Sequence, residues 1–258
     1  ASGIIAGVEP YDFEVLSKLT KLKCISRAGV GTDNIDIEFA KKKGIIIKNT
    51  PNVVITPVVE LTLAMILDLL KRLTMQSLYL KNNKWKKIPG NLLFGKNVGI
   101  IGTGRIGKQV CIVLKSLGAN ISAYDINQDL EWSSKNNISY KSFKKIILNS
   151  DIISLHAAPN NNNIPIIDYK EISLMKEGVI IVNTARGGLI NENALIKGID
   201  SNIVGGIGLD VFPEEPYRGK LVNYENVVLT PHIATLTIES RLEMEIEATE
   251  NLIQELKK

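Results

Sequence analysis

The stretch that most constrains the fold runs from Val98 to Gly107 and reads VGIIGTGRIG. Its first four residues are β-branched or glycine and carry no polar side chain, as expected for a strand buried on both faces of a parallel sheet. After it, Gly102 permits a tight turn, Gly104 lets a phosphate approach the backbone, and Gly107 allows close packing of the next helix. The pattern predicts a strand, a turn and a helix whose first N–H groups bind a pyrophosphate.

Asp125 extends this pattern toward a complete nucleotide site. It ends a second predicted strand, Asn120 to Asp125, and in a βαβ unit a carboxylate at this place binds the adenosine ribose hydroxyls of a dinucleotide. Residues 126–128 are Ile, Asn and Gln, so no arginine stands beside Asp125 to bind a 2′-phosphate. Asp125 could instead be an ordinary strand-end residue, but the strand, glycines, helix and spacing together favour an NAD site, and NAD over NADP.

The remainder of the chain alternates short apolar strands with helical segments, which is the pattern of parallel sheets covered by helices. Strands are predicted at 3–6, 22–26, 45–48, 98–101, 121–124, 151–155, 179–183, 205–209 and 227–229. Asn49 to Asn52 breaks the alternation with a proline-containing turn, and an amphipathic helix from Thr237 ends the chain. We therefore predict an α/β protein with two doubly wound parallel-sheet domains, in which the six strands from residue 98 onward form the nucleotide-binding domain.

Composition and charge narrow the range of partners. With 45% hydrophobic and 22% charged residues the chain resembles an ordinary soluble globular protein, and its net charge of +4 comes from scattered lysines without a basic run, so no nucleic acid is expected. The apolar stretch from Val58 to Leu70 is interrupted by Glu60 and Asp68, which predicts a helix and no membrane span. No segment with the cationic, apolar and small-residue pattern of a leader is found, so no targeting leader is expected. The two cysteines have no metal-ligand spacing and predict buried thiols in a reducing cytoplasm, without a metal site.

Four loops that follow predicted strands are rich in groups that bind or transform ligands. Open parallel sheets bind ligands outside the carboxyl ends of their strands, so these loops are the candidate site. They are Arg27 to Asp33, Asn183 to Gly188, Asp210 to Pro216 and Thr230 to Thr235.

In this order around GTGRIG, the four loops resemble those of the D-isomer-specific 2-hydroxyacid dehydrogenases, and most closely those of the phosphoglycerate dehydrogenase-like branch. The resemblance runs from about Gly3 to Leu256. It implies a Rossmann NAD domain over residues 53–235, inserted into a flavodoxin-like substrate domain formed by 1–52 and 236–258. Members of the family usually have further βα units before Gly3, so the N-terminal part of the substrate domain is expected to be missing from this chain.

The resemblance also implies an activity. It predicts an NAD-dependent oxidoreductase that interconverts a D-2-hydroxy acid and its 2-keto acid by hydride transfer, with 3-phosphoglycerate, or glyoxylate and hydroxypyruvate, as candidate substrates. Two rivals remain: a phosphite dehydrogenase-like enzyme, and an NADH-sensing binding protein of the corepressor type. The apolar helix from Val58 to Leu70 fits a homodimer interface, as in family dimers, although burial within one chain would produce the same pattern.

Carried over residue by residue, the resemblance gives catalytic roles to Arg186, Glu215 and His232. An arginine fork suits a substrate carboxylate and ketone, a histidine suits proton transfer near neutral pH, and a neighbouring carboxylate favours the imidazolium and holds its ring. Arg186 could also be a structural turn residue, and Glu214 competes with Glu215 for the histidine. The other histidine, His156, is expected to line the crevice or to be structural.

Further positions carry binding roles by the same resemblance. The amides of Val30 and Gly31 are expected to hold the substrate carboxylate, while Arg27 either contacts the substrate or forms a salt bridge. The expected cofactor contacts are Gly102, Gly104, Arg105, Ile106, Gly107, Asp125, Thr184, Ala185 and Asp210, the last for the carboxamide.

Two departures from the family pattern affect the details. Where members commonly have His-x-Pro-Leu, this chain has HAAPNNNN from His156 to Asn163, which leaves the cofactor contacts there open. Phosphoglycerate-type members often carry a basic residue after the first strand. Here the chain continues as Ala6-Gly7-Val8-Glu9 and offers no cation to a phosphate, which weakens that substrate assignment.

Overall fold

The computed structural model describes residues 1–159 and 164–257, and the chain divides into two compact units. The first is discontinuous and comprises Ala1–Pro57 with Thr235–Lys258, and the second is Val58–Ala234. Departures from the family's cofactor contacts were expected over 156–163, and residues 160–163 of that segment lie outside the described residues. The boundaries expected at 52/53 and 235/236 stay a prediction about separately folding domains.

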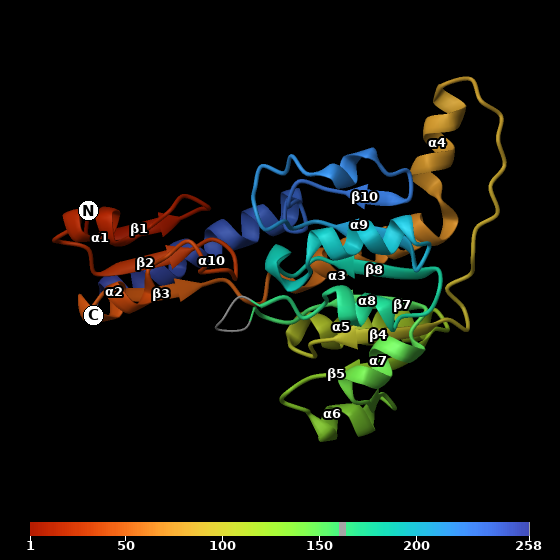
Figure 1. Cartoon of the computed structure of the whole chain (residues 1–258). Coiled ribbons are helices and arrows are strands. Elements are labelled where there is room, and N and C mark those ends of the chain that lie inside the picture. The colour runs from red at the N-terminus through yellow and green to blue at the C-terminus, as the bar shows by residue number, and fades with distance from the viewer. Residues whose placement is uncertain (160–163, 258) are drawn as a thin grey trace. The chain divides into compact units, whose positions relative to one another are not determined.

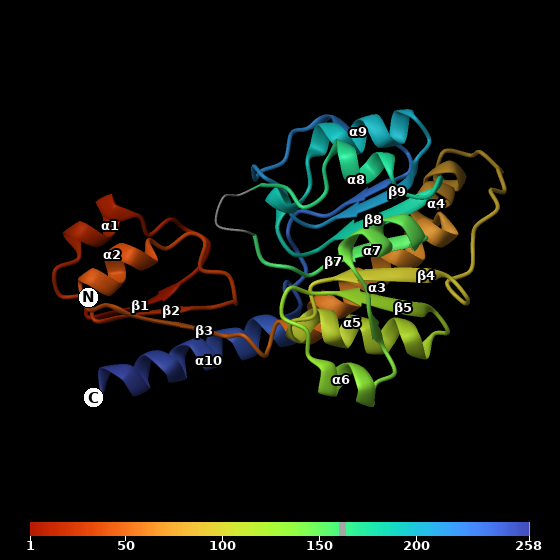
Figure 2. The same ribbon diagram turned by 60° about the horizontal axis from the view of Figure 1, so that its bottom comes forward.

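The first unit is a three-stranded parallel sheet with helices on both faces (Figure 2). Its strands are β1 (Gly3–Ala6), β2 (Cys24–Arg27) and β3 (Ile46–Asn49), in the order β1-β2-β3. One face carries α1 (Phe13–Lys18) and α2 (Ile37–Lys42), and the other carries α10 (Ile238–Leu256).

The long helix α10 is tied to this sheet at both of its edges. A Cβ on Gly3 of β1 would lie 2.7 Å from Leu252 Cδ1, so the absent side chain lets the helix pack closely. At the β3 edge, Lys48 pairs with Glu255 at 3.2 Å. Thr237 begins the helix, because its hydroxyl oxygen accepts a hydrogen bond from Ser240 N at 3.1 Å.

The second unit is a seven-stranded, fully parallel sheet (Figure 1). Its order is β10-β9-β8-β7-β4-β5-β6, so the chain winds outward in both directions from β4, the arrangement of a doubly wound nucleotide-binding domain. The strands are β4 (Asn97–Ile101), β5 (Asn120–Tyr124), β6 (Ser139–Tyr140), β7 (Ile152–Leu155), β8 (Val179–Asn183), β9 (Val204–Leu209) and β10 (Val227–Leu229).

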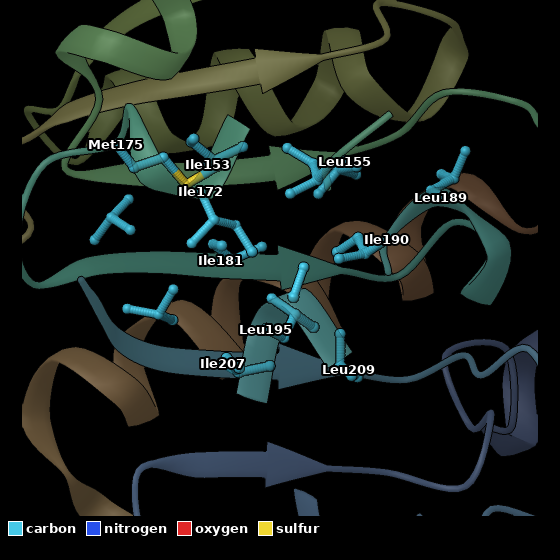
Figure 3. Close-up of a cluster of buried hydrophobic side chains, with 14 of the residues drawn as sticks. Ile153, Leu155, Ile172, Met175, Ile181, Leu189, Ile190, Leu195, Ile207 and Leu209 are labelled. Atoms are coloured by element: carbon cyan, nitrogen blue, oxygen red, sulfur yellow. The ribbon is translucent and has the colours of Figure 1, made fainter. Parts of the chain in front are cut away.

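Helices cover both faces of this larger sheet. Their bounds are α3 (Ile55–Lys71), α4 (Leu73–Lys81), α5 (Arg105–Ser116), α6 (Leu130–Lys135), α7 (Phe143–Asn149), α8 (Tyr169–Ser173) and α9 (Glu192–Asp200), with short 3-10 turns η1 (Gly187–Leu189) and η2 (Lys220–Asn223). On one face, side chains of α7, α8 and α9 form a continuous apolar core with β7, β8 and β9 (Figure 3). On another side, α3 approaches β9, where Gly206 and Gly208 leave room for Leu69 and Met65.

The structure corrects three expectations about elements. It adds β6, a strand of two residues that pair with β5, so the larger sheet has seven strands instead of six. No apolar run in the sequence indicates this strand. It adds α4, in a stretch without a clear apolar face. It also starts α3 at Ile55, three residues before the apolar stretch from Val58 that predicted this helix.

Much of the apolar stripe on helix α3 is buried within the chain, one of the two alternatives that the sequence left open. Val58, Val59, Met65, Ile66 and Leu70 are each at most 7% exposed within the chain itself. None of the helices over 1–159 and 164–257 has the length and hydropathy needed to cross a bilayer.

Candidate active site

Most of the predicted site residues follow the carboxyl ends of strands in the seven-stranded sheet. Because all its strands are parallel, these loops lie along one edge. The strands in spatial order, each with the residues that follow it, are β10 with His232, β9 with Asp210 and Glu215, β8 with Thr184, Ala185 and Arg186, β7 with His156, β4 with the glycine turn, and β5 with Asp125.

The glycine-rich turn has the shape that a pyrophosphate requires. Gly102 has φ +93°, and a Cβ there would lie 2.5 Å from the backbone of Ala157; a Cβ on Gly107 would lie 2.0 Å from Gly102 O. By contrast, a Cβ on Gly104 would meet nothing within 4 Å, so the space above it is clear. Gly104 caps α5 without a side-chain hydrogen bond, which leaves the first N–H groups of the helix, at Arg105 and Ile106, for an anion.

Asp125 is held by a network that the sequence did not reveal. Thr103 donates to Asp125 Oδ2 from its backbone N at 2.6 Å and from its hydroxyl at 3.1 Å, and Asn127 N donates to Oδ1 at 2.8 Å. The Thr103 hydroxyl lies 2.7 Å from the hydroxyl of Tyr140 on β6. Thr103 occupies a variable position of the glycine motif and Tyr140 lies in the strand that pattern reasoning missed, so neither carried a signal.

His232 and Glu215 come together as a hydrogen-bonded pair. His232 Nδ1 lies 2.9 Å from Glu215 Oε2, and Phe212 N donates to the other carboxylate oxygen at 3.1 Å. The side chains of His232 and Glu215 are 50% and 39% exposed, so the histidine ring is open to a ligand. Among the described residues the histidine forms this contact with Glu215 and none with Glu214, so the geometry favours Glu215 over its neighbour.

Asp210 anchors the loop that carries His232. This carboxylate is 1% exposed and accepts hydrogen bonds from the Thr230 hydroxyl at 2.6 Å, from Ile233 N at 2.8 Å and from Ala234 N at 3.0 Å. The donors lie on both sides of His232, whose φ of +53° is unusual for a residue with a side chain. Asp210 therefore compensates for local backbone strain that aims the histidine outward.

Arg186 lies on a loop that packs directly against the Glu215 loop. Its Nη1 donates to Ala185 O at 2.7 Å, and Asn183 Nδ2 donates to Arg186 O at 2.8 Å. A Cβ on the next residue, Gly187, would lie 1.9 Å from Phe212 C. The absence of a side chain at 187 therefore lets the arginine-bearing loop approach the glutamate-bearing loop.

Two further residues between the cofactor and catalytic loops are fixed by hydrogen bonds. The hydroxyls of Thr184 and Thr62 lie 2.9 Å apart, and Thr62 donates its own proton to Val58 O at 2.7 Å, so Thr184 is the donor of the pair. His156 Nε2 lies 2.9 Å from the Ser154 hydroxyl. Desolvation of the ring lowers the pKa of His156 to about 4, so the histidine is neutral at neutral pH.

The first unit carries the loop predicted to bind the substrate carboxylate. Val30 and Gly31 follow β2, and within the described residues their backbone N–H groups donate no hydrogen bond. Asn49 Nδ2 donates to Val30 O at 3.0 Å, and Thr50 Oγ1 accepts from Gly29 N at 2.8 Å, so the loop is braced while those amides stay available. Arg27, at the end of β2, donates to Ala28 O.

One cavity of the second unit lies away from these loops. It has a volume of about 300 Å³ and lies at the starts of β9 and β10, lined by residues of α3, α4 and η2 that include Arg72 and Tyr79. None of the predicted site residues lines it. Over residues 1–159 and 164–257, no three His, Cys, Asp or Glu side chains gather as metal ligands would.

Comparison with known proteins identifies the family. A profile described as "D-isomer specific 2-hydroxyacid dehydrogenase, NAD binding domain" matches residues 63–234. A hydroxypyruvate reductase of Thermotoga maritima is 39% identical over 252 residues, covering 94% of this chain and 80% of the relative. A D-3-phosphoglycerate dehydrogenase of Bacillus subtilis is 34% identical, over 93% of this chain but only 46% of the relative. The crystal structure of a glyoxylate reductase from Paecilomyes thermophila superposes with a TM-score of 0.93 at 34% identity, over 100% of this chain and 81% of that one.

The chain therefore belongs to the D-isomer-specific 2-hydroxyacid dehydrogenase family. Its cofactor is NAD, and the open glycine turn, the uncapped start of α5 and the carboxylate at Asp125 fit that group. It is an NAD-dependent oxidoreductase that interconverts a D-2-hydroxy acid and its 2-keto acid.

Proposed function

We propose that this enzyme reduces a small 2-keto acid, of the size of glyoxylate or hydroxypyruvate, with His232 as the proton donor. The observation that carries the proposal is the 2.9 Å contact between His232 Nδ1 and Glu215 Oε2. With Nδ1 facing the carboxylate, Nε2 is the nitrogen left to face a substrate. Glu215 holds the ring in this orientation and stabilises its positive charge.

The residues divide the chemistry as follows. When bound, NADH supplies the hydride that reaches the carbonyl carbon. His232 gives its Nε2 proton to the carbonyl oxygen as the negative charge develops there, and takes it back in the oxidative direction. Arg186 supplies the positive charge that polarises the ketone and binds the carboxylate. In the first unit, the backbone amides of Val30 and Gly31, which donate no hydrogen bond among the described residues, would bind a substrate carboxylate.

Different residues of the second unit would hold the pyrophosphate, the ribose and the nicotinamide of the cofactor. The turn at Gly102 to Gly107 and the first turn of α5, with Arg105 and Ile106, would hold the pyrophosphate. Asp125 would bind the adenosine ribose. Thr184 and Ala185 would lie at the nicotinamide, and any lone pair of Asp210 not taken by its three loop donors would be left for the carboxamide.

The first test compares the two histidines of the chain. His232→Ala should lower kcat by about 10²- to 10⁴-fold, the usual contribution of a general acid–base, because the proton donor is lost. His156→Ala is the matched control and should retain turnover, since that histidine is neutral and hydrogen-bonded to Ser154. Steady-state NADH oxidation measures both, and equal activity of the two variants would reject the assignment.

Substrate class is tested by following NADH absorbance with glyoxylate, hydroxypyruvate, pyruvate, 2-ketoglutarate and 3-phosphohydroxypyruvate. We expect turnover with one or more of the small acids. NADH binding without oxidation by any 2-keto acid would favour a sensor protein of the corepressor type. NAD reduction by phosphite would favour the phosphite dehydrogenase-like alternative.

We also propose that the enzyme is a homodimer. The support comes from apolar side chains that α4 and the segment after it leave exposed: Leu73, Leu78, Leu80, Trp85 and Leu92 are 53–80% exposed. Large apolar side chains exposed along one segment are typical of a contact between protein chains. Light scattering during size-exclusion chromatography should give twice the chain mass. A monomer at micromolar concentration would reject this proposal.

A cytoplasmic location is the accompanying proposal. Its support is that Cys24 and Cys111 are both buried and free, and burial raises the pKa of the Cys111 thiol to about 12. Such thiols suit a reducing compartment.

A further inference from the structure

The carboxylate of Glu9 stands at the carboxyl edge of the three-stranded sheet, just beyond β1. Tyr11 Oη donates to Glu9 Oε1 at 2.6 Å, and Gly7 N donates to the same oxygen at 3.1 Å. The Tyr11 hydroxyl, and after it the backbone amides of Glu9 and Gly7, lower the pKa of Glu9 below its ordinary value. The side chain therefore carries a fixed negative charge at neutral pH.

The second oxygen of this carboxylate remains open to a ligand. Oε2 accepts no hydrogen bond from another residue among residues 1–159 and 164–257, and a Cβ on Gly7 would lie 2.6 Å from it. A glycine at 7 thus leaves room for the carboxylate to fold back over the end of β1. Both oxygens are acceptors, so this position attracts hydrogen-bond donors and repels anions.

Hydrogen bonds connect the loop of Glu9 to the loop of Val30 and Gly31. Asn34 Nδ2 donates to Glu9 O at 2.6 Å and to Gly7 O at 3.2 Å, and Tyr11 N donates to Asn34 O at 2.7 Å. Because β1 and β2 are parallel neighbours, the two loops leave the sheet at the same edge. The acidic side chain therefore belongs to the same surface as the amides proposed to bind the substrate carboxylate.

The other charged groups at this edge do not form a phosphate site. Arg27 donates to Ala28 O and contributes to the lowered pKa of Glu9. Lys48 is paired with Glu255 at 3.2 Å. Asp33 adds a second acid to the loop that carries Gly31. A phosphate needs converging cations, and this part of the described structure offers a carboxylate in their place.

We propose that Glu9 is a specificity-determining residue that restricts the enzyme to 2-keto acids with an uncharged group at carbon 3, and excludes phosphorylated ones. The inference rests on the proposed function, because it assumes that the Val30 and Gly31 amides bind the substrate carboxylate. A hydroxyl at carbon 3 can donate to Glu9, whereas a phosphate at that place meets like charge. Hydroxypyruvate is accordingly preferred to 3-phosphohydroxypyruvate.

The experiment compares kcat/KM for these two acids in the wild type, in Glu9→Gln and in Glu9→Lys. The wild type should prefer hydroxypyruvate by about 100-fold or more, since like charges at short range are strongly unfavourable. The ratio of kcat/KM for the two acids should shift toward the phosphorylated acid by about 10-fold in Glu9→Lys. The shift should be smaller in Glu9→Gln, because glutamine removes the repulsion without adding a positive charge. Glu14→Lys is the matched control, an acid of the same unit in the first turn of α1, and should leave the ratio unchanged.

Two results would overturn the inference. One is a wild type that reduces 3-phosphohydroxypyruvate as efficiently as hydroxypyruvate. The other is a ratio that Glu9→Lys changes no more than Glu14→Lys does. Failure of the proposed function would give a different result. None of the proteins would then reduce any 2-keto acid, although NADH fluorescence would still report cofactor binding. The proposed role of Glu9 would be rejected as well.

Discussion

The hydrogen bonds around Asp125 form a chain with a single direction. Asp129 N–H donates to Tyr140 Oη at 3.2 Å, and a carboxylate such as Asp125 can only accept. Tyr140 must then donate to Thr103, and Thr103 to Asp125, because each hydroxyl has a single proton. A chain of this kind holds the carboxylate in the orientation that we propose for binding the ribose.

Tyr140→Phe should therefore weaken NADH binding by about 3- to 10-fold, the effect of losing one hydrogen bond in a positioning chain. The KM for NADH should rise while kcat at saturation stays near that of the wild type, because Tyr140 acts only through Asp125. Fluorescence titration with NADH measures the change. Tyr224→Phe is the control, since its hydroxyl donates to Asp200 at 3.0 Å. Equal effects of the two variants would contradict the role of Tyr140.

At the element scale, the catalytic arrangement depends on how closely two loops approach. The turn into η1 carries Arg186, and the loop after β9 carries Glu215, whose orientation depends on Phe212 N. Phe212 also stacks on Tyr217 with ring centroids 4.2 Å apart, which stiffens the second loop. Contact between the loops is possible because Gly187 has no side chain.

Gly187→Ala should separate these loops, since its Cβ would lie 1.9 Å from Phe212 C, far inside contact distance. We expect a loss of about 1–3 kcal/mol in the free energy of unfolding, as for other overpacked positions, together with a fall in kcat. Gly188→Ala is a strict control, because a Cβ there meets nothing within 4 Å. Urea unfolding and NADH oxidation measure the two effects. A Gly187→Ala enzyme as stable and active as Gly188→Ala would show that the loops do not need this contact.

At the scale of the whole molecule, stability should depend on pH through His156. Its pKa is about 4 in the folded protein against an ordinary value of 6.5, so below pH 6.5 the unfolded chain binds a proton that the folded chain does not. Stability should fall as pH drops from about 6.5 to about 4, and this group should contribute nothing above that window. The carboxylates of Glu9, Asp129 and Asp151 have lowered pKa values in the folded protein. Their contribution to stability is therefore lost only as the pH falls further.

His156→Gln should remove much of this dependence, since glutamine does not titrate. Melting temperatures at about pH 7.5 and about pH 5 would show a smaller difference in the variant than in the wild type. An equal drop in both proteins would mean that His156 does not titrate in this window.

The sequence alone predicted much of the architecture. Buried strands such as β4 and β8 are continuous apolar runs, and the glycines after β4 have local conformational requirements, so both leave signals in neighbouring residues. The cofactor was predicted from these signals and the family from the four loops around GTGRIG, and the comparisons confirm both. The catalytic roles of Arg186, Glu215 and His232 stay predictions, supported by the geometry of the site.

Other features could not be read from the sequence. Tyr140 meets Thr103 across 37 positions, and Thr62 meets Thr184 across 122, and no local pattern encodes such pairs. The two-residue strand β6 owes its existence to pairing with β5, which a search for apolar runs does not detect. The apolar stripe on α3 fits either a subunit contact or burial inside the chain, and the sequence does not distinguish the two. The packing of Met65 and Leu69 beside Gly208 on β9 shows that part of the stripe is buried inside the chain.

Most of the strands, the glycine turn after Ile101 and the chemistry available at the strand ends could be read from the sequence, because these depend on residues close together in the chain. Only the tertiary structure decided which oxygen of Glu215 meets His232, how Thr103 and Tyr140 orient Asp125, and that Glu9 stands beside the loop of Val30 and Gly31. Those contacts join segments far apart in sequence, and their geometry is set by the packing of whole sheets and helices, which local periodicity does not specify.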